Sequence, residues 1–273
     1  MDSYNYISIG KNRIAYKQRG KGKKVILIHG VLSYSFLWDE VIEDLVDEFE
    51  LIAVDLLGCG NSDKPKGVDY SIVAQAEMLK NLILQLEIAP LHLIGHDVGG
   101  GISQILATKY PKLFIDLTLI NSVGYGYWPV QPITTMRLPI IRRLTSSIVN
   151  PTLLKMVLGR AIYHKERLTP QLINKFWYPF QTPEGKAGFV QLIKCINNRM
   201  LIEITQNLRN LKLSTLIIRG DADAYLSRNI SQELVKDIPN SRFEVVPFAG
   251  HFIQIDEPKL ISRLMREFMN EYK

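Results

Sequence analysis

The sequence predicts an α/β protein built on a mostly parallel, doubly wound sheet, with one helical insertion in the chain. Two observations lead to this fold class. Short apolar runs alternate with amphipathic helical periods, which is typical of buried parallel strands joined by crossover helices. The alternation stops between residues 124 and 211, where we find helical periods and no clear strand. We therefore expect a core domain formed by residues 1–123 and 212–273, with residues 124–211 inserted as a helical cap.

Six continuous apolar runs predict the parallel strands. Each run is short and rich in Val, Ile and Leu, as expected for a strand that is covered on both faces. Two segments with alternating apolar residues, 4–9 and 13–18, precede them and predict an N-terminal hairpin. The six runs span residues 24–30, 49–58, 91–95, 116–121, 214–221 and 241–247.

Apolar stripes at helical spacing predict the helices. In the core domain the stripes cover residues 37–46, 72–86 and 260–269. Ligands of open α/β sheets bind beyond the carboxyl ends of the strands, so a cap inserted there would cover the binding site. The helical segments of the insertion are residues 134–149, 151–163, 169–180 and 184–208.

Composition and charge exclude several classes of function. The net charge is +6, but the basic residues are scattered among acidic ones, so we expect no nucleic-acid partner. Cys59 and Cys195 lack the spacing of a zinc site, and we expect both to be reduced, as in a cytoplasmic protein. The N-terminus lacks a signal-peptide pattern, and the longest uncharged run, 117–136, is broken by glycine and proline, so we expect no membrane span. The pattern favours no particular oligomeric state.

A glycine-tight turn follows the third apolar run, in the sequence "GHDVG" at residues 95–99. Asp97 stands at its apex, between a predicted strand and a glycine-rich helix start. A residue exposed on so sharp a turn needs small neighbours, because the backbone folds back against strand and helix, and Gly95 and Gly99 meet that need. The amide of Val98 and the helix N-terminus would stabilise negative charge beside it. The alternative role for Asp97 is helix capping, which would not require the flanking glycines.

The chain resembles the α/β-hydrolase fold superfamily over nearly its whole length. The resemblance is carried by "HG", "DLLGCGNSDKP", "GHDVGG", "RGDAD" and "GHFIQIDEP", which follow one another in the family's order, each after a predicted strand. It implies a nucleophile elbow at Asp97 and a catalytic triad completed by Asp223 and His251. His251 would be the general base and Asp223 the acid that orients it, with Asp221 as the competing acid.

The same resemblance implies an oxyanion hole. Val31, directly after His29 and Gly30, would supply a peptide amide in addition to that of Val98. We expect His29 to brace the loop that carries Val31, called the oxyanion loop below, rather than to change its protonation state.

An aspartate at the elbow restricts the reaction. Attack of a carboxylate on an acyl carbon gives a high-energy anhydride, whereas attack on a saturated carbon gives an ordinary alkyl ester. Water activated by His251 could then hydrolyse that ester at the Asp97 carbonyl. The substrate should therefore carry an electrophilic sp3 carbon with a leaving group, and Asp97 resembles the nucleophile of epoxide hydrolases and haloalkane dehalogenases.

The leaving group divides these two activities. Dehalogenases typically place Trp directly after the nucleophile, where this chain has Val98, and Val31 also offers no side-chain donor to a halide. Epoxide hydrolases typically have His-Gly-x-Pro, where this chain has Leu32 in place of proline, and use tyrosines of the cap as proton donors. We favour an epoxide hydrolase, with a haloalkane dehalogenase as the alternative.

Two further alternatives remain open: an esterase or C–C hydrolase that tolerates Asp97, and a small-molecule binding protein without efficient turnover. A small-molecule substrate is the expected partner in every case but the last. We expect no metal or organic cofactor, because the chain itself supplies nucleophile, base and charge stabiliser. The alternative role for aromatic residues of the insertion is packing within it. Candidate leaving-group or substrate contacts in the insertion are Tyr125, Tyr127, Trp128, Tyr163, Trp177 and Tyr178.

Overall fold

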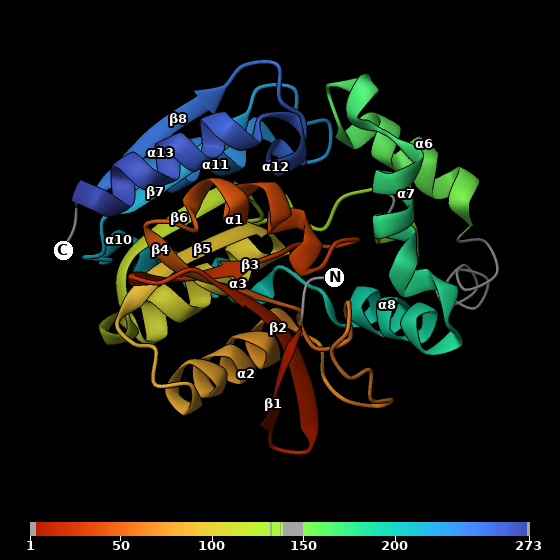
Figure 1. Cartoon of the computed structure of the whole chain (residues 1–273). Coiled ribbons are helices and arrows are strands. Elements are labelled where there is room, and N and C mark those ends of the chain that lie inside the picture. The colour runs from red at the N-terminus through yellow and green to blue at the C-terminus, as the bar shows by residue number, and fades with distance from the viewer. Residues whose placement is uncertain (1–3, 132, 137, 139–149, 272–273) are drawn as a thin grey trace.

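The computed structural model describes residues 4–131, 133–136, 138 and 150–271. In this part of the chain eight strands form one sheet in the order β1-β2-β4-β3-β5-β6-β7-β8 (Figure 1). Strand β2 runs antiparallel to β1 and β4, and the remaining neighbours are parallel. The predicted fold class, the hairpin and the six parallel strands are therefore confirmed. The bounds are β1 Asn5–Ile9, β2 Asn12–Arg19, β3 Lys23–Ile28, β4 Phe49–Val54, β5 Leu91–Asp97, β6 Phe114–Ser122, β7 Thr215–Gly220 and β8 Ser241–Val246.

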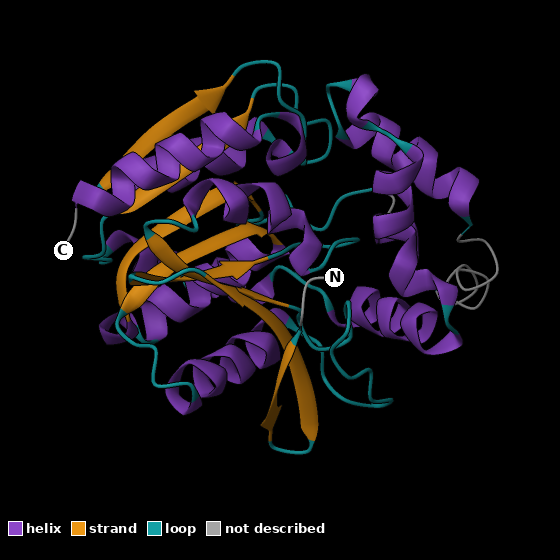
Figure 2. Ribbon diagram, viewed as in Figure 1, coloured by secondary structure: helices purple, strands orange, loops and turns teal. Residues whose placement is uncertain are grey.

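Helices cover both faces of the sheet, as Figure 2 shows by colour. Alternate residues of one strand enter different cores: Val25 and Leu27 of β3 pack in one apolar cluster, Ile26 and Ile28 in the other. This double coverage explains why the strands are apolar throughout rather than alternating. One face carries α1 (Asp39–Leu45), α12 (Ile253–Asp256) and α13 (Pro258–Glu271), and the other carries α2 (Ile72–Gln85), α3 (Val98–Lys109) and α11 (Arg228–Asp237).

The described residues of the segment between β6 and β7 form helices joined by loops and contain no strand. The three longest helices among its described residues are capped by Asn150, Thr169 and Thr182, whose side chains each accept a backbone N–H of the first turn, and each helix starts with the proline that follows its cap. A polar cap followed by proline at the first helical position is a strong start signal. The helices are α4 (Ile133–Met136), α6 (Pro151–Ala161), α7 (Pro170–Trp177), α8 (Pro183–Cys195), α9 (Arg199–Glu203) and α10 (Thr205–Arg209).

Helices α6, α7 and α8 lie together at one side of the sheet (Figure 1). Most of the predicted helical segment 134–149 lies outside the described residues. The boundaries of the cap, residues 124 and 211, stay a prediction. Within the described residues no helix is both long and apolar enough to cross a bilayer. Cys59 and Cys195 are both free thiols.

Candidate active site

The predicted chemistry-bearing residues meet at the carboxyl edge of the sheet. Asp97 is the last residue of β5, Val31 follows β3, Asp223 follows β7 and His251 follows β8. All four are buried, with Asp97 only 5% exposed. Because these strands are parallel within one sheet, their carboxyl ends lie along the same edge and bring together residues that are far apart in the sequence.

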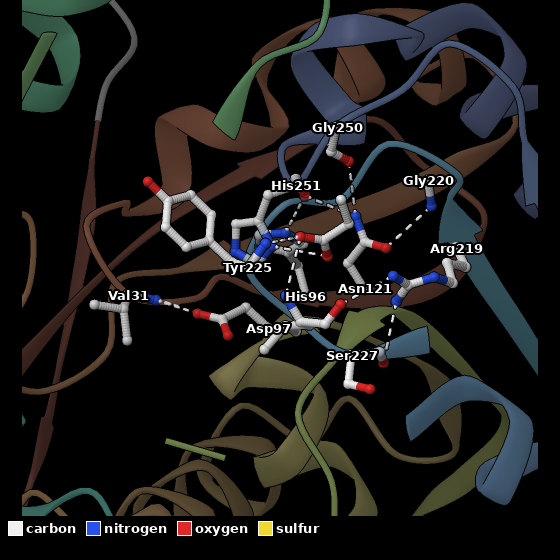
Figure 3. A network of polar contacts seen from close by, with 12 residues as sticks. Val31, His96, Asp97, Asn121, Arg219, Gly220, Tyr225, Ser227, Gly250 and His251 are labelled. Atoms are coloured by element: carbon white, nitrogen blue, oxygen red, sulfur yellow. Dashed lines mark hydrogen bonds and ion pairs between the residues drawn. The ribbon is translucent and has the colours of Figure 1, made fainter. Parts of the chain in front are cut away.

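Asp97 occupies a strained backbone conformation, with φ 52° and ψ −119°. Left-handed φ values are rare outside glycine and concentrate at functional sites. Its side chain makes no capping bond to α3; instead its Oδ2 accepts the Val31 amide at 2.8 Å. The capping role is therefore wrong, and the carboxylate instead contacts the amide of Val31 in the predicted oxyanion loop (Figure 3).

The glycines around this turn are required by close backbone contacts. A Cβ on Gly99 would lie 2.3 Å from the carbonyl oxygen of Ile28, and a Cβ on Gly95 would lie 2.4 Å from that of Gly99. A Cβ on Gly30 would lie 2.5 Å from the Asp97 carboxylate itself. Such distances are well inside van der Waals contact, so only glycine lets strand, turn and helix approach this closely.

The side chains of His251 and Asp223, predicted as base and orienting acid, lie within hydrogen-bond distance of each other. His251 Nδ1 and Asp223 Oδ2 are 3.1 Å apart, and the other carboxylate oxygen accepts the amides of Tyr225 and Leu226 at 2.9 and 3.1 Å. These bonds fix the orientation of the carboxylate, so that its Oδ2 faces the imidazole. The competing acid, Asp221, is exposed, so the geometry selects Asp223.

Burial and charge set the protonation of the pair. Burial by itself lowers the pKa of His251, but the charges of Asp223 and Asp97 outweigh it and raise that pKa above its ordinary value. Burial by itself raises the pKa of Asp223, but His251 and the two backbone amides outweigh it and hold that pKa below its ordinary value. Burial raises the pKa of Asp97, opposed by His251 and the amides of Val31 and Val98. The amides of Val31 and Val98, which were predicted to form the oxyanion hole, therefore both lie at the Asp97 carboxyl.

The main chain of His251 is held on both sides. Its N–H donates to the carbonyl of Ala161 at the end of α6, at 2.7 Å. Its carbonyl accepts from His96 Nε2 and from Asn121 Nδ2, both at 2.9 Å. Asn121 also donates to the Gly250 carbonyl and accepts from the Gly220 amide. It thereby links the ends of β6 and β7 to the loop that carries His251, called the histidine loop below (Figure 3).

Asp256 fastens the same loop to the segment after α6. Its carboxylate accepts the amide of Gly250 at 2.8 Å, that of Tyr163 at 3.0 Å and that of His164 at 2.9 Å. Asp256 is 2% exposed, so these charge-assisted bonds are made away from water. Neither Asn121 nor Asp256 was predicted; their signals in the sequence were an Asn ending an apolar run and an acid within "GHFIQIDEP".

His29 braces the oxyanion loop, as expected. Its Nδ1 lies 2.8 Å from the Gly30 carbonyl and its Nε2 accepts the Leu56 amide at 3.0 Å, so the ring is neutral with the proton on Nδ1. Burial lowers the pKa of His29, which keeps this tautomer in place.

An apolar pocket of about 80 Å³ opens onto Asp97 and His251. Its wall includes Leu32, Trp128 and Phe189, together with Tyr225, which sequence reasoning did not single out. The Tyr225 ring packs against His251 with centroids 5.6 Å apart, and its hydroxyl donates to the Val157 carbonyl at 2.9 Å. Within the described residues no group of three or more His, Cys, Asp or Glu side chains is arranged to hold a metal.

Of the six aromatic candidates in the insertion, Trp128 lines this pocket and the other five do not. The hydroxyls of Tyr125, Tyr127 and Tyr178 donate to Asp237, Glu233 and Asn61. Tyr163 is 43% exposed beside Phe248, and Trp177 stacks on Phe180.

Comparison with known proteins agrees with this architecture. Residues 23–146 match the family described as alpha/beta hydrolase fold. The chain is 28% identical over 260 residues to the "Uncharacterized hydrolase YugF" of Bacillus subtilis, covering 93% of this chain and 92% of that protein. It is 24% identical over 267 residues to the monoacylglycerol lipase ABHD6 of Mus musculus, covering 94% and 79%.

Solved structures share the fold over almost the whole chain. An alpha/beta hydrolase fold protein from Burkholderia ambifaria has a TM-score of 0.88 at 24% identity, covering 96% of both chains. The epoxide hydrolase CorEH has a TM-score of 0.86 at 20% identity, covering 98% and 99%. A putative ancestral haloalkane dehalogenase, AncHLD2, has a TM-score of 0.85 at 21% identity, covering 98% of both. The family match, the sheet order and these structural similarities show that the chain has the α/β-hydrolase fold.

Proposed function

We propose that this protein is a hydrolase in which the Asp97 carboxylate attacks an electrophilic sp3 carbon and forms an alkyl ester, and that epoxides are its substrates. The observation that carries the proposal is the Asp97 carboxylate, which lies on the strained elbow 2.8 Å from the Val31 amide, with the His251–Asp223 pair at the same site. Similar proteins with named activities include a lipase, an epoxide hydrolase and a dehalogenase, so the choice among them depends on the chemistry of residue 97.

The two steps make different demands on His251. In the free enzyme the Asp97 charge helps to raise the pKa of His251. Alkylation neutralises Asp97 and removes that contribution, so the pKa of His251 falls and the imidazole becomes ready to accept a proton from water. The amides of Val31 and Val98, which contact the carboxylate, are then in reach of the oxyanion formed when water attacks the ester carbonyl.

The leaving group favours an epoxide over a halide. Opening an epoxide requires a proton at the ring oxygen, and Tyr225 is among the described residues that line the pocket, with its hydroxyl donating to the Val157 carbonyl. We assign this proton to Tyr225, whose hydroxyl turns from the Val157 carbonyl to the ring oxygen; burial raises its pKa and keeps the phenol protonated in the free enzyme. The proton that His251 takes from water in the second step then returns the phenolate to the phenol. Val98, directly after the nucleophile, has no side-chain N–H for a halide. The observation that favours the second candidate, a haloalkane dehalogenase, is Trp128, an indole in the same wall.

The test is covalent capture. His251→Gln should block ester hydrolysis, so that an alkyl-enzyme accumulates and is seen by intact-protein mass spectrometry. The protein is incubated with a panel of terminal epoxides and a panel of 1-haloalkanes. A mass increase equal to the whole epoxide supports ring opening, and an increase lacking the halogen supports the dehalogenase. Asp97→Ala in the same background is the matched control and should give no adduct.

Two results would count against the proposal. Absence of any adduct with both panels would favour the ester or binding alternatives, and an adduct that persists after Asp97→Ala would assign the nucleophile elsewhere. Tyr225→Phe tests the assignment of the proton: it should slow adduct formation with epoxides and leave that with haloalkanes unchanged.

A further inference from the structure

A second, smaller cavity lies next to the catalytic pocket, and the two share part of their walls. The second cavity has a volume of about 20 Å³. The residues common to both linings are Leu32, in the oxyanion loop, and Phe189, on α8. These two side chains therefore separate the cavities; we call them the partition.

Leu32 takes its place in the partition in a left-handed backbone conformation, with φ 66°. For a bulky side chain this conformation is unfavourable, and residues held in it concentrate at active sites and ligand-binding segments. Leu32 follows Val31, whose amide contacts Asp97, so the partition is built onto the loop that carries the oxyanion amide.

The far wall of the second cavity is closely packed and mostly apolar. A Cβ on Gly188 of α8 would lie 2.6 Å from the Gly58 carbonyl, so helix and loop touch through their backbones. The Ser33 hydroxyl in this wall donates to the Gly30 carbonyl, and burial, aided by Asp55, raises the pKa of the Cys59 thiol to about 12. A neutral thiol and a satisfied hydroxyl leave a surface suited to a hydrocarbon group.

We propose that the partition of Leu32 and Phe189 limits the length of the apolar group that the active site accepts, which makes compact, uncharged molecules the substrate class. The proposal rests on the function proposed above for Asp97. The catalytic pocket, about 80 Å³, is about half the 150 Å³ of an apolar cavity that holds benzene. A short alkyl group fills it, and a longer one meets the partition before it can reach the second cavity.

The test removes the partition without straining the backbone. Leu32→Gly places glycine where φ is positive, which glycine adopts at no steric cost, and opens the wall. Phe189→Ala opens the same wall from α8 and serves if Leu32→Gly does not fold. Glu87→Gly is the matched control, because Glu87 also has a positive φ, 53°, and lies outside both linings.

Turnover is compared along the series from 1,2-epoxypropane to 1,2-epoxyoctane. Both partition variants should raise kcat/KM for the longest epoxide relative to the shortest by about tenfold or more, since each methylene admitted or refused by an apolar pocket has effects of this size. Glu87→Gly should leave the profile unchanged. An unchanged profile in both partition variants, with the shortest epoxide still turned over, would overturn the partition and leave the proposed function standing.

A binding experiment separates the two proposals. In the Asp97→Ala background, calorimetry with n-alkanols from propanol to octanol measures length preference without chemistry. We expect octanol to gain affinity in the partition variants and propanol to remain unchanged. If turnover is absent in every variant but this shift occurs, the reaction is wrong and the partition stands. The same affinities with and without the partition, or no alkanol binding at any length, would refute it.

Discussion

Asp256 offers the sharpest test of how the histidine loop is held. Asp256→Asn keeps the shape of the side chain but replaces one carboxylate oxygen by an NH2 group. The better orientation keeps the oxygen on the amides of Gly250 and Tyr163 and turns the NH2 group toward the His164 amide, where two donors face each other. The bond from the His164 amide is lost, and the bonds from the Gly250 and Tyr163 amides are no longer made to a charged group.

The magnitude follows from these bonds. A hydrogen bond to a charged group contributes about 1.5–3 kcal/mol, and a buried donor left without a partner costs a similar amount. We expect the free energy of unfolding to fall by about 2–3 kcal/mol and the midpoint of thermal unfolding to fall by roughly 4–10 °C. Urea and thermal unfolding followed by circular dichroism measure both quantities.

The matched control for this change is Glu257→Gln, next along the chain. Glu257 also contacts His164, but through the imidazole at 3.1 Å and with 35% of its side chain exposed. Its effect should stay below about 1 kcal/mol. If Asp256→Asn changes stability no more than this control, the carboxylate does not hold the loop as described.

Three further predictions concern the elbow. Gly99→Ala should lower the free energy of unfolding by more than about 3 kcal/mol, because its Cβ would meet the Ile28 carbonyl at 2.3 Å. The control is Gly159→Ala on α6, whose Cβ would enter open space and which should raise the free energy of unfolding by up to about 1 kcal/mol. Chemical denaturation measures both variants, and equal effects would contradict the packing argument. Asp97→Asn should raise the free energy of unfolding at neutral pH, because burial raises the pKa of Asp97 above its value in the unfolded chain. The gain should shrink as the pH falls through the raised pKa of Asp97. A gain that does not depend on pH would refute burial of the Asp97 charge as its cause. In single-turnover kinetics, alkylation should be lost at low pH as Asp97 becomes protonated. Ester hydrolysis should be lost below the pKa of His251, and that pKa should be lower in the alkyl-enzyme than in the free enzyme. The same His251 pKa in the free enzyme and the alkyl-enzyme would exclude coupling between the two residues.

The core was predictable because each parallel strand is buried on both faces. Residues such as Ile26 and Leu27 enter different apolar clusters, and the resulting run of apolar side chains is visible in the sequence without any partner being known. The elbow was predictable for a related reason, since backbone contacts at Gly95 and Gly99 admit no side chain.

The supports of the site were not predictable in the same way. Asn121 contacts main-chain atoms of residues 250 and 251, and Asp256 contacts those of residues 163 and 164. No local pattern encodes a partner that is about a hundred residues away, and a backbone amide gives no signal of its own in the sequence. Tyr225 lines the pocket from the loop of Asp223 rather than from the insertion, where aromatic candidates were sought.

The bond from the His251 amide to the Ala161 carbonyl bears on how the insertion can be exchanged between relatives. Segments that roof an active site are attractive units for grafting, because new specificity is expected to come with them. Here the last turn of α6 is tied to the loop of the proposed base, so a graft that replaces α6 also replaces its anchor. A chimera joined after residue 164 would exchange α7 and α8 while retaining this anchor, and we expect such a junction to preserve the geometry of the histidine.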